Sequence, residues 1–301
     1  MRTRLLILPL LLATAASTTR AQGTAPTFRV TLSAAAAGAA GGHAYVLAGT
    51  DPAKAKAVTI PTLLVPVALV FATRQTAAGA PFVLDAARVQ DRLLRSPVFS
   101  DFSFTPSTRT QYMDAMLRAT FPHTAKSWHT RLGRPEVEPV RINVPAGEGY
   151  VLTSKRQGGA VAVVDRDFVE RAIFSQVPAE PGKLVIAVTL NTTYYALGDA
   201  TVCCSWGTHG VDPATGDSFV LGSYLQNAPP VVHDRDVQPL TQQLAEYILN
   251  PGHNPLLAER AHDGGNIFPA WMRPMGPGGC GGTGAGSTYF MLEPKIGRAH
   301  V

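Results

Sequence analysis

The chain has 301 residues, a hydrophobic fraction of 46% and a formal charge of +5, which together suit a folded protein with a sizeable core. Three basic residues, Arg2, Arg4 and Arg20, lie in an N-terminal segment that we expect to be removed, and their loss leaves a formal charge of +2. This small charge gives no argument for an anionic membrane as a partner, and with no Lys and Arg cluster interleaved with aromatic residues we expect no nucleic acid partner. No later apolar stretch has the length of a membrane span.

The N-terminus has the three parts of a secretory signal peptide. A basic head at residues 1–4 precedes an apolar run at residues 5–16, and the small residues Thr19 and Ala21 predict cleavage after Ala21. The run is shorter than the ~20 residues that a membrane anchor needs. The sequence therefore predicts a secreted protein, extracellular or periplasmic. The alternative is that the run forms a buried N-terminal helix.

We divide the chain into a signal peptide at 1–21, an Ala- and Gly-rich segment at 22–56, one domain at 57–294, and a tail at 295–301. The second segment is expected to hold a strand at 28–32 and a loop at 34–42. The tail has the sequence that a common sequencing adapter gives when translated. We interpret it as an artefact, and a natural frayed end is the alternative.

The first half of the domain combines strands and helices. Residues 58–72 form an apolar run that predicts a strand broken at Pro66. Asp85 is placed to cap a helix that passes Val89 and Leu93 and ends before Pro97. A second helix is expected at 109–121, with a buried stripe of Tyr112, Met113, Met116, Leu117 and Thr120.

The second half is dominated by predicted strands. Short strands between Gly turns are expected at 140–164, and longer ones at 183–191, 194–206 and 218–225. Helices are predicted at 167–176 and at 236–250, the latter ended by Pro251 and Gly252. This order of elements predicts the α+β class, with a mixed and mostly antiparallel sheet.

Three cysteines remain after export: Cys203, Cys204 and Cys280. Disulfides persist outside the cytoplasm, and adjacent cysteines rarely bond each other because the geometry is strained. We expect one of the pair to bridge to Cys280 and leave an odd thiol, without assigning which one. The alternative is that all three stay reduced and buried.

The predicted helix at 236–250 carries an arrangement with chemical interest. Val237, Leu240, Leu244 and Ile248 form an apolar side, and Gln242, Gln243 and Glu246 form the opposite arc. Positions 242 and 246 lie one turn apart on the same face, which is the spacing of two zincin metal ligands around a general-base Glu. Taken alone, such an arc is typical of a solvated helix face.

Several short motifs, in order over about 58–294, resemble a family of secreted bacterial zincin-like metalloproteases. The motifs are Ser96-Pro97-Val98-Phe99, Thr110-Gln111-Tyr112-Met113-Asp114-Ala115, Arg118-Ala119-Thr120-Phe121 and Thr201-Val202-Cys203-Cys204-Ser205-Trp206-Gly207-Thr208-His209. Further matches are Leu240-Thr241-Gln242-Gln243-Leu244-Ala245-Glu246-Tyr247, Asn250-Pro251, Pro269-Ala270-Trp271 and Gly279-Cys280.

The resemblance implies a helix with a His-Glu-x-x-Glu motif, degenerate in this copy. Gln242 stands where the family has the first ligand, Gln243 stands at the general-base position, Glu246 is retained, and Glu293 is the candidate third ligand. A Gln amide is a poor zinc ligand and cannot take a proton from water at neutral pH. We therefore expect a pseudoenzyme without a cofactor, or with zinc if the ancestral site survives, and with a peptide or glycan as its ligand.

Two other functions stay open. The chain is an active zinc metallopeptidase if substituted ligands converge on Glu246, and a noncatalytic extracellular binding protein if the helix lines no cleft. The histidines near these motifs have no recognised ligand spacing; they are His209, His233, His253 and His262. His209 is of most interest because it lies beside the two adjacent cysteines.

Overall fold

The computed structural model describes residues 24–32, 43–51, 53–105, 107–121, 128–153, 159–226, 236–252, 272–274 and 290–292. Its helical elements are η1 (Ala86–Val89), α2 (Gln90–Arg95), α3 (Tyr112–Thr120), α4 (Arg166–Phe174) and α5 (Gln238–Leu249). Its strands are β1 (Thr27–Leu32), β2 (His43–Ala48), β3 (Ala57–Ile60), β4 (Thr62–Gln75), β5 (Pro81–Asp85), β6 (Phe102–Thr105), β7 (Thr108–Thr110), β8 (His129–Leu132), β9 (Glu136–Val137), β10 (Val140–Asn143), β11 (Gly149–Thr153), β12 (Ala160–Asp165), β13 (Leu184–Leu190), β14 (Thr192–Ala196), β15 (Asp199–Ser205), β16 (Gly207–Val211), β17 (Ser218–Tyr224), β18 (Met272–Pro274) and β19 (Phe290–Leu292).

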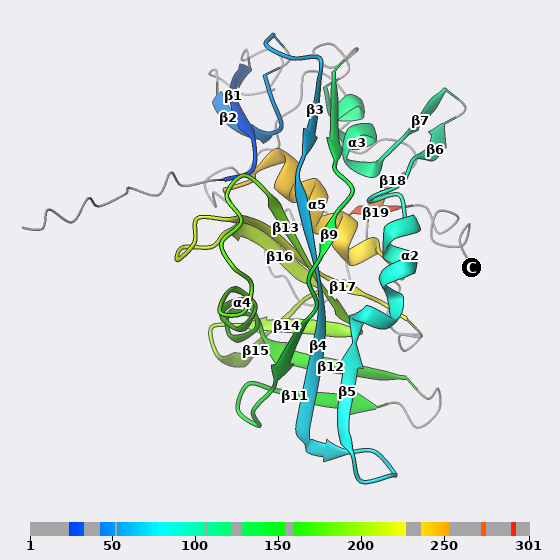
Figure 1. The fold of residues 1–301 in the computed structure, drawn as a ribbon, viewed down its shortest axis with the longest axis vertical. Coiled ribbons are helices and arrows are strands. Elements are labelled where there is room, and N and C mark those ends of the chain that lie inside the picture. The colour runs from blue at the N-terminus through cyan, green and yellow to red at the C-terminus, as the bar shows by residue number, and fades with distance from the viewer. Residues whose placement is uncertain are drawn as a thin grey trace, which may run out of the picture.

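The largest sheet has the order β10-β4-β13-β17-β16, with β5 and β9 also paired to the long strand β4 (Figure 1). Its central pairs β10–β4, β4–β13 and β13–β17 are parallel, whereas β5 and β16 join as antiparallel hairpin partners. Every residue of β13 is buried. A continuously apolar strand of this kind is typical of a parallel sheet that is covered on both faces.

The long apolar run divides at a different proline from the one predicted. The chain breaks at Pro61, between β3 and β4, and Pro66 lies inside β4. Leu64 pairs with β9 and Val67 pairs with β10, so Pro66 lies where one edge of β4 changes its partner. A residue without an amide proton is tolerated there because no continuous ladder is interrupted.

A second sheet has the order β11-β12-β14-β15, and its strands run across the direction of β4 in Figure 1. The two sheets share a stretch of chain, because β13 ends at Leu190 and β14 begins at Thr192. Asn191, between them, has a φ of 47°, and its side-chain Oδ1 accepts a hydrogen bond from the Gln226 amide at 2.6 Å. Its left-handed backbone lets the chain pass from one sheet to the other.

The predicted helices form close to their expected bounds. Asp85 caps η1 by accepting a hydrogen bond from the Ala87 amide at 2.9 Å, as the sequence suggested. α3 begins three residues later than expected because residues 108–110 pair as β7, and its predicted stripe is buried. The α+β class is confirmed. The mixed and largely antiparallel pairing is confirmed too, and the parallel pairs include the centre of the large sheet.

No helix among the described residues is long and apolar enough to cross a membrane. The predicted signal peptide at 1–21, the loop at 34–42 and the tail at 295–301 lie outside the described residues.

Candidate functional site

Helix α5 packs directly on strands β16 and β17 of the large sheet (Figure 1). Leu240, Leu244 and Ile248 are fully buried on its apolar side. Its opposite arc is buried too: Gln242 is 5% exposed and Gln243 is 6% exposed. The interpretation of this arc as a solvated face is therefore wrong. The structure buries polar amides where a surface helix would present them to water.

A pair of glycines explains how close the helix lies to the sheet. Gly207 of β16 and Gly222 of β17 are register partners beneath α5. A Cβ atom built on Gly222 would lie 2.7 Å from Leu240 Cα, and one built on Gly207 would lie 2.8 Å from Gln243 Cγ. Because neither glycine has a side chain, the helix backbone and the Gln243 side chain occupy that space.

His209 of β16 joins the polar arc of the helix. Its Nδ1 atom lies 3.3 Å from Gln243 Oε1 and 3.8 Å from Glu246 Oε2. Its Nε2 atom lies 3.1 Å from the carbonyl oxygen of Asn250, which can only accept, so Nε2 carries a proton. The His209 side chain is 3% exposed, and the contacts of its two ring nitrogens connect the middle of α5 to its C-terminal end.

The contact between Nδ1 and Gln243 is satisfied in two arrangements. In one, the Gln243 amide is turned so that its NH2 group donates to a neutral imidazole. In the other, the imidazole carries a second proton, donates to Gln243 Oε1 and has the Glu246 carboxylate as its nearby counterion. Both arrangements occupy the two ring nitrogens of His209 with protein partners.

The aromatic neighbour of His209 is Tyr247, at a ring centroid distance of 6.5 Å in a T-shaped arrangement. Burial raises the pKa of Tyr247 to about 12, and the nearby Ser218 side chain opposes this rise. The phenol is therefore protonated at neutral pH and contributes no charge to the site.

The donor set that the structure brings together is unlike that of a zinc site. Gln242 and Gln243 offer neutral amides, Glu246 offers one carboxylate, and both nitrogens of His209 face protein atoms. Among the residues that the structure describes, no group of three His, Cys, Asp or Glu side chains is arranged to hold a metal ion. Of the other predicted participants, Glu293, His233, His253 and His262 lie outside the described residues.

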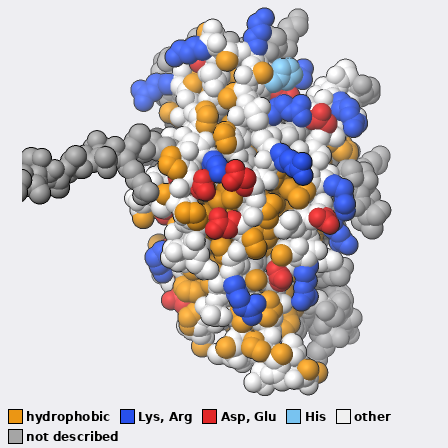
Figure 2. Space-filling view, in the orientation of Figure 1, with side chains coloured by type: hydrophobic (Ala, Val, Ile, Leu, Met, Phe, Trp, Pro, Cys, Tyr) orange, Lys and Arg blue, Asp and Glu red, His pale blue; other side chains and the backbone are white. Residues whose placement is uncertain are grey.

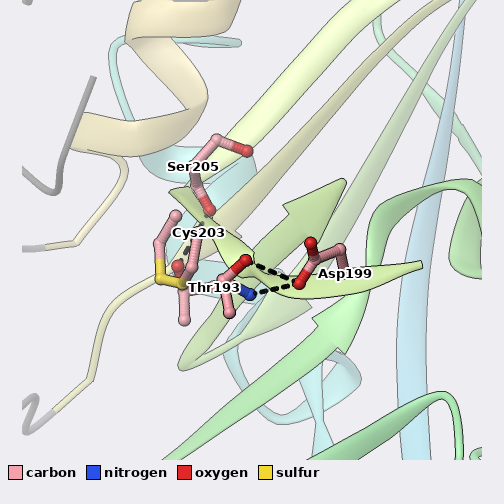
Figure 3. The surroundings of a disulfide bond; sticks show 6 residues. Thr193, Asp199, Cys203 and Ser205 are labelled. Carbon is pink, nitrogen blue, oxygen red and sulfur yellow. Dashed lines mark hydrogen bonds between the residues drawn. A yellow bond between two sulfur atoms is a disulfide. The ribbon is translucent and has the colours of Figure 1, made fainter. Parts of the chain in front are cut away.

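Cys203 and Cys204 lie on β15, and their sulfur atoms are joined in the structure (Figure 3). The peptide bond between them is cis. β15 is irregular here: Tyr194 pairs with Ser205 and Tyr195 pairs with Cys203, so Cys204 is an extra residue in the ladder. Cys280 lies outside the described residues.

Sequence reasoning missed a second buried polar cluster, centred on Asp114 of α3. Asp114 is fully buried, and its carboxylate accepts hydrogen bonds from the Thr110 hydroxyl at 2.8 Å and the Thr130 amide at 3.2 Å. Both carboxylate oxygens lie 3.1 Å from His129 Nδ1, and Arg118 is 3.8 Å away. The sequence did contain a signal for this cluster. Asp114 is the one acidic residue of the predicted helix at 109–121, and it lies four positions after Thr110, a spacing at which two side chains can meet.

Glu170 of α4 is a carboxyl group whose pKa departs widely from its ordinary range. Burial raises its pKa to about 7; Arg166 opposes the rise, and Asp167, Asp212 and Asp165 add to it. Its Oε1 atom lies 3.4 Å from Arg166 Nε but makes no hydrogen bond. Such a carboxyl group is protonated more readily in the folded protein than in the unfolded chain.

This difference predicts how stability changes with pH. Because the folded pKa exceeds the unfolded value of 4.5, stabilisation by proton binding is complete below pH 4.5 and is lost as the pH rises through 7. We expect Glu170→Gln to raise the free energy of unfolding by about 2 kcal/mol at pH 8 and by much less at pH 5. Urea unfolding at both pH values measures this. Glu136→Gln, at an exposed position, is the control; an equal gain for Glu170→Gln at both pH values would contradict the assignment.

Comparisons with known proteins give no relative for this chain: no family model, curated protein or solved structure matches it.

Proposed function

We propose that the chain is an exported zincin-like protein without peptidase activity, in which the former catalytic helix has become a structural element. The observation that carries the proposal is the environment of the two glutamines. Gln242 and Gln243, which stand where the resemblance implies a ligand and a general base, are buried, and Gln243 contacts an imidazole whose other nitrogen is engaged by the Asn250 carbonyl. An amide at these positions neither holds zinc firmly nor accepts a proton from a bound water.

The proposal predicts that the processed protein, purified without chelators, contains no stoichiometric zinc and shows no chelator-sensitive cleavage of peptides. The double variant Gln242→His, Gln243→Glu rebuilds the motif next to Glu246. We expect it to bind zinc at least about tenfold more tightly than the wild-type protein, because an imidazole replaces an amide at the first ligand position. Elemental analysis and zinc titration measure both quantities.

A matched variant separates metal binding from a general change at this position. Gln242→Asn with Gln243→Asn keeps both amides and should leave zinc affinity at the wild-type level. One zinc ion bound tightly by the wild-type protein and lost in Glu246→Ala would overturn the proposal.

One observation favours the second candidate, an active metallopeptidase with substituted ligands. Such a site needs a His or carboxylate side chain close to Glu246, and His209 Nδ1 lies 3.8 Å from Glu246 Oε2. This candidate predicts peptide cleavage that a chelator abolishes and that His209→Ala removes. For either candidate, a peptide or a glycan is the ligand class that we propose to test first.

A further inference from the structure

The small overall charge of this protein conceals a strong separation of charge along the chain. Residues 53–134 contain eleven Lys and Arg residues against four Asp and Glu residues. Residues 135–250 contain seven Lys and Arg residues against thirteen Asp and Glu residues. Overall charge therefore says little about the field at any one face, which is set by how the charges are distributed.

The basic part of the chain includes an exposed row of arginines on η1 and α2. Arg88, Arg92 and Arg95 follow one another at spacings of four and three residues, which places them along one face of the helical segment. All three are exposed, and the only acidic residue among them is Asp91. The row spans about 10 Å at the helical rise of 1.5 Å per residue.

Further basic side chains lie on neighbouring elements. In Figure 1, α2, α3 and the β6–β7 hairpin occupy the same side of the molecule, and Figure 2 shows Lys and Arg side chains distributed along it. Arg109 and Arg134 are exposed, as are Lys54 and Lys56 just before β3. Two of the four acidic residues in 53–134 contribute little negative charge to the surface, because Asp101 pairs with Arg131 and Asp114 is buried.

We call the exposed row of Arg88, Arg92 and Arg95 the arginine face; Arg109 and Arg134 are further exposed arginines of the same basic part of the chain. We propose that the arginine face docks on the headgroups of an anionic phospholipid bilayer. A row of exposed guanidinium groups matches a surface of phosphate groups, and each such residue near an anionic membrane adds to the attraction.

The composition of the arginine face favours a lipid surface over a single-stranded nucleic acid. Residues 86–95 contain no aromatic side chain between the arginines, so the row offers no platform on which bases would stack. The predicted export of the chain also places it beside lipid surfaces. The proposal does not depend on α5 or its metal chemistry, because it concerns a different part of the fold.

The test is co-sedimentation with vesicles. The purified protein should bind vesicles of equal parts phosphatidylglycerol and phosphatidylcholine, should not bind vesicles of phosphatidylcholine alone, and should be released by salt. Arg88→Glu with Arg95→Glu should lower the affinity for the anionic vesicles by about tenfold or more. Arg92 is left unchanged because its positive charge opposes the rise in the pKa of the Tyr224 phenol, so its replacement would affect more than the surface.

The matched control is Arg141→Glu with Arg171→Glu, which makes the same change in charge at exposed positions of the other part of the chain. It should lower the affinity much less. The proposal is overturned if the wild-type protein fails to bind anionic vesicles, if it binds both vesicles equally, or if the two double variants lose the same affinity. Circular dichroism of each variant confirms that it is folded.

Discussion

Replacing Gly222 by alanine should lower the free energy of unfolding by about 3 kcal/mol, because the added methyl group meets the backbone of helix α5. The new Cβ atom would lie 2.7 Å from Leu240 Cα and 3.1 Å from Leu240 Cβ. Atoms so close to a helix backbone cannot be relieved by a side-chain rotation, so α5 or β17 must shift. Urea denaturation followed by circular dichroism measures the change.

Gly147 provides the comparison for this substitution. A Cβ atom at Gly147 meets nothing within 4 Å, and its φ does not require glycine. Gly147→Ala should change stability by less than about 1 kcal/mol, in either direction. Equal stability of the two alanine variants would show that α5 is not held against the sheet as the structure has it.

Replacing Asp114 by alanine should cost about 3–5 kcal/mol, since it removes the shared acceptor of a buried cluster. The Thr110 hydroxyl and the Thr130 amide both donate to the Asp114 carboxylate, and His129 contacts both of its oxygens. Without the carboxylate, buried donors on β7 and β8 lose their partner, and α3 loses its direct links to both strands. Equilibrium unfolding in urea gives the value.

Asp101→Ala is the matched control, because Asp101 also pairs with an arginine but at the surface. Asp101 and Arg131 each keep 39% of their side-chain area exposed, and exposed pairs of this kind contribute less than about 1 kcal/mol. If Asp114→Ala destabilised the protein no more than Asp101→Ala, the cluster would have no structural importance.

Local patterns in the sequence predicted most elements of the fold. The Asp85 cap, the buried stripe of α3 and the strand at 184–190 follow from periodicity and end signals, which depend on neighbouring residues alone. The prediction of a mixed sheet did not say which strands pair in parallel, although the nearly continuous apolar run of β13 was visible. Runs of that kind favour strands covered on both faces, which is the usual situation in a parallel sheet.

The candidate site was only partly predictable. The spacing of Gln242 and Glu246 identified the helix, and the position of His209 marked it as a residue of interest. The burial of Gln243 could not be read locally, because its side chain occupies space that Gly207 leaves open on β16, far from α5 in the sequence. The Asp114–His129 contact likewise joins residues 15 positions apart that share no periodic pattern.

The passage of the chain through Asn191 links the stability of the two sheets. β13 pairs with both β4 and β17, and the next residues enter β14, where the Thr192 amide donates to Ser223 of β17 at 2.8 Å. Separating the two sheets would require β13, the central strand of the large sheet, and β14, an inner strand of the second sheet, to lose their pairing. Neither sheet therefore ends in an edge strand at this junction where local unfolding could begin. We expect the amide protons of the two sheets to exchange with solvent in one shared opening event.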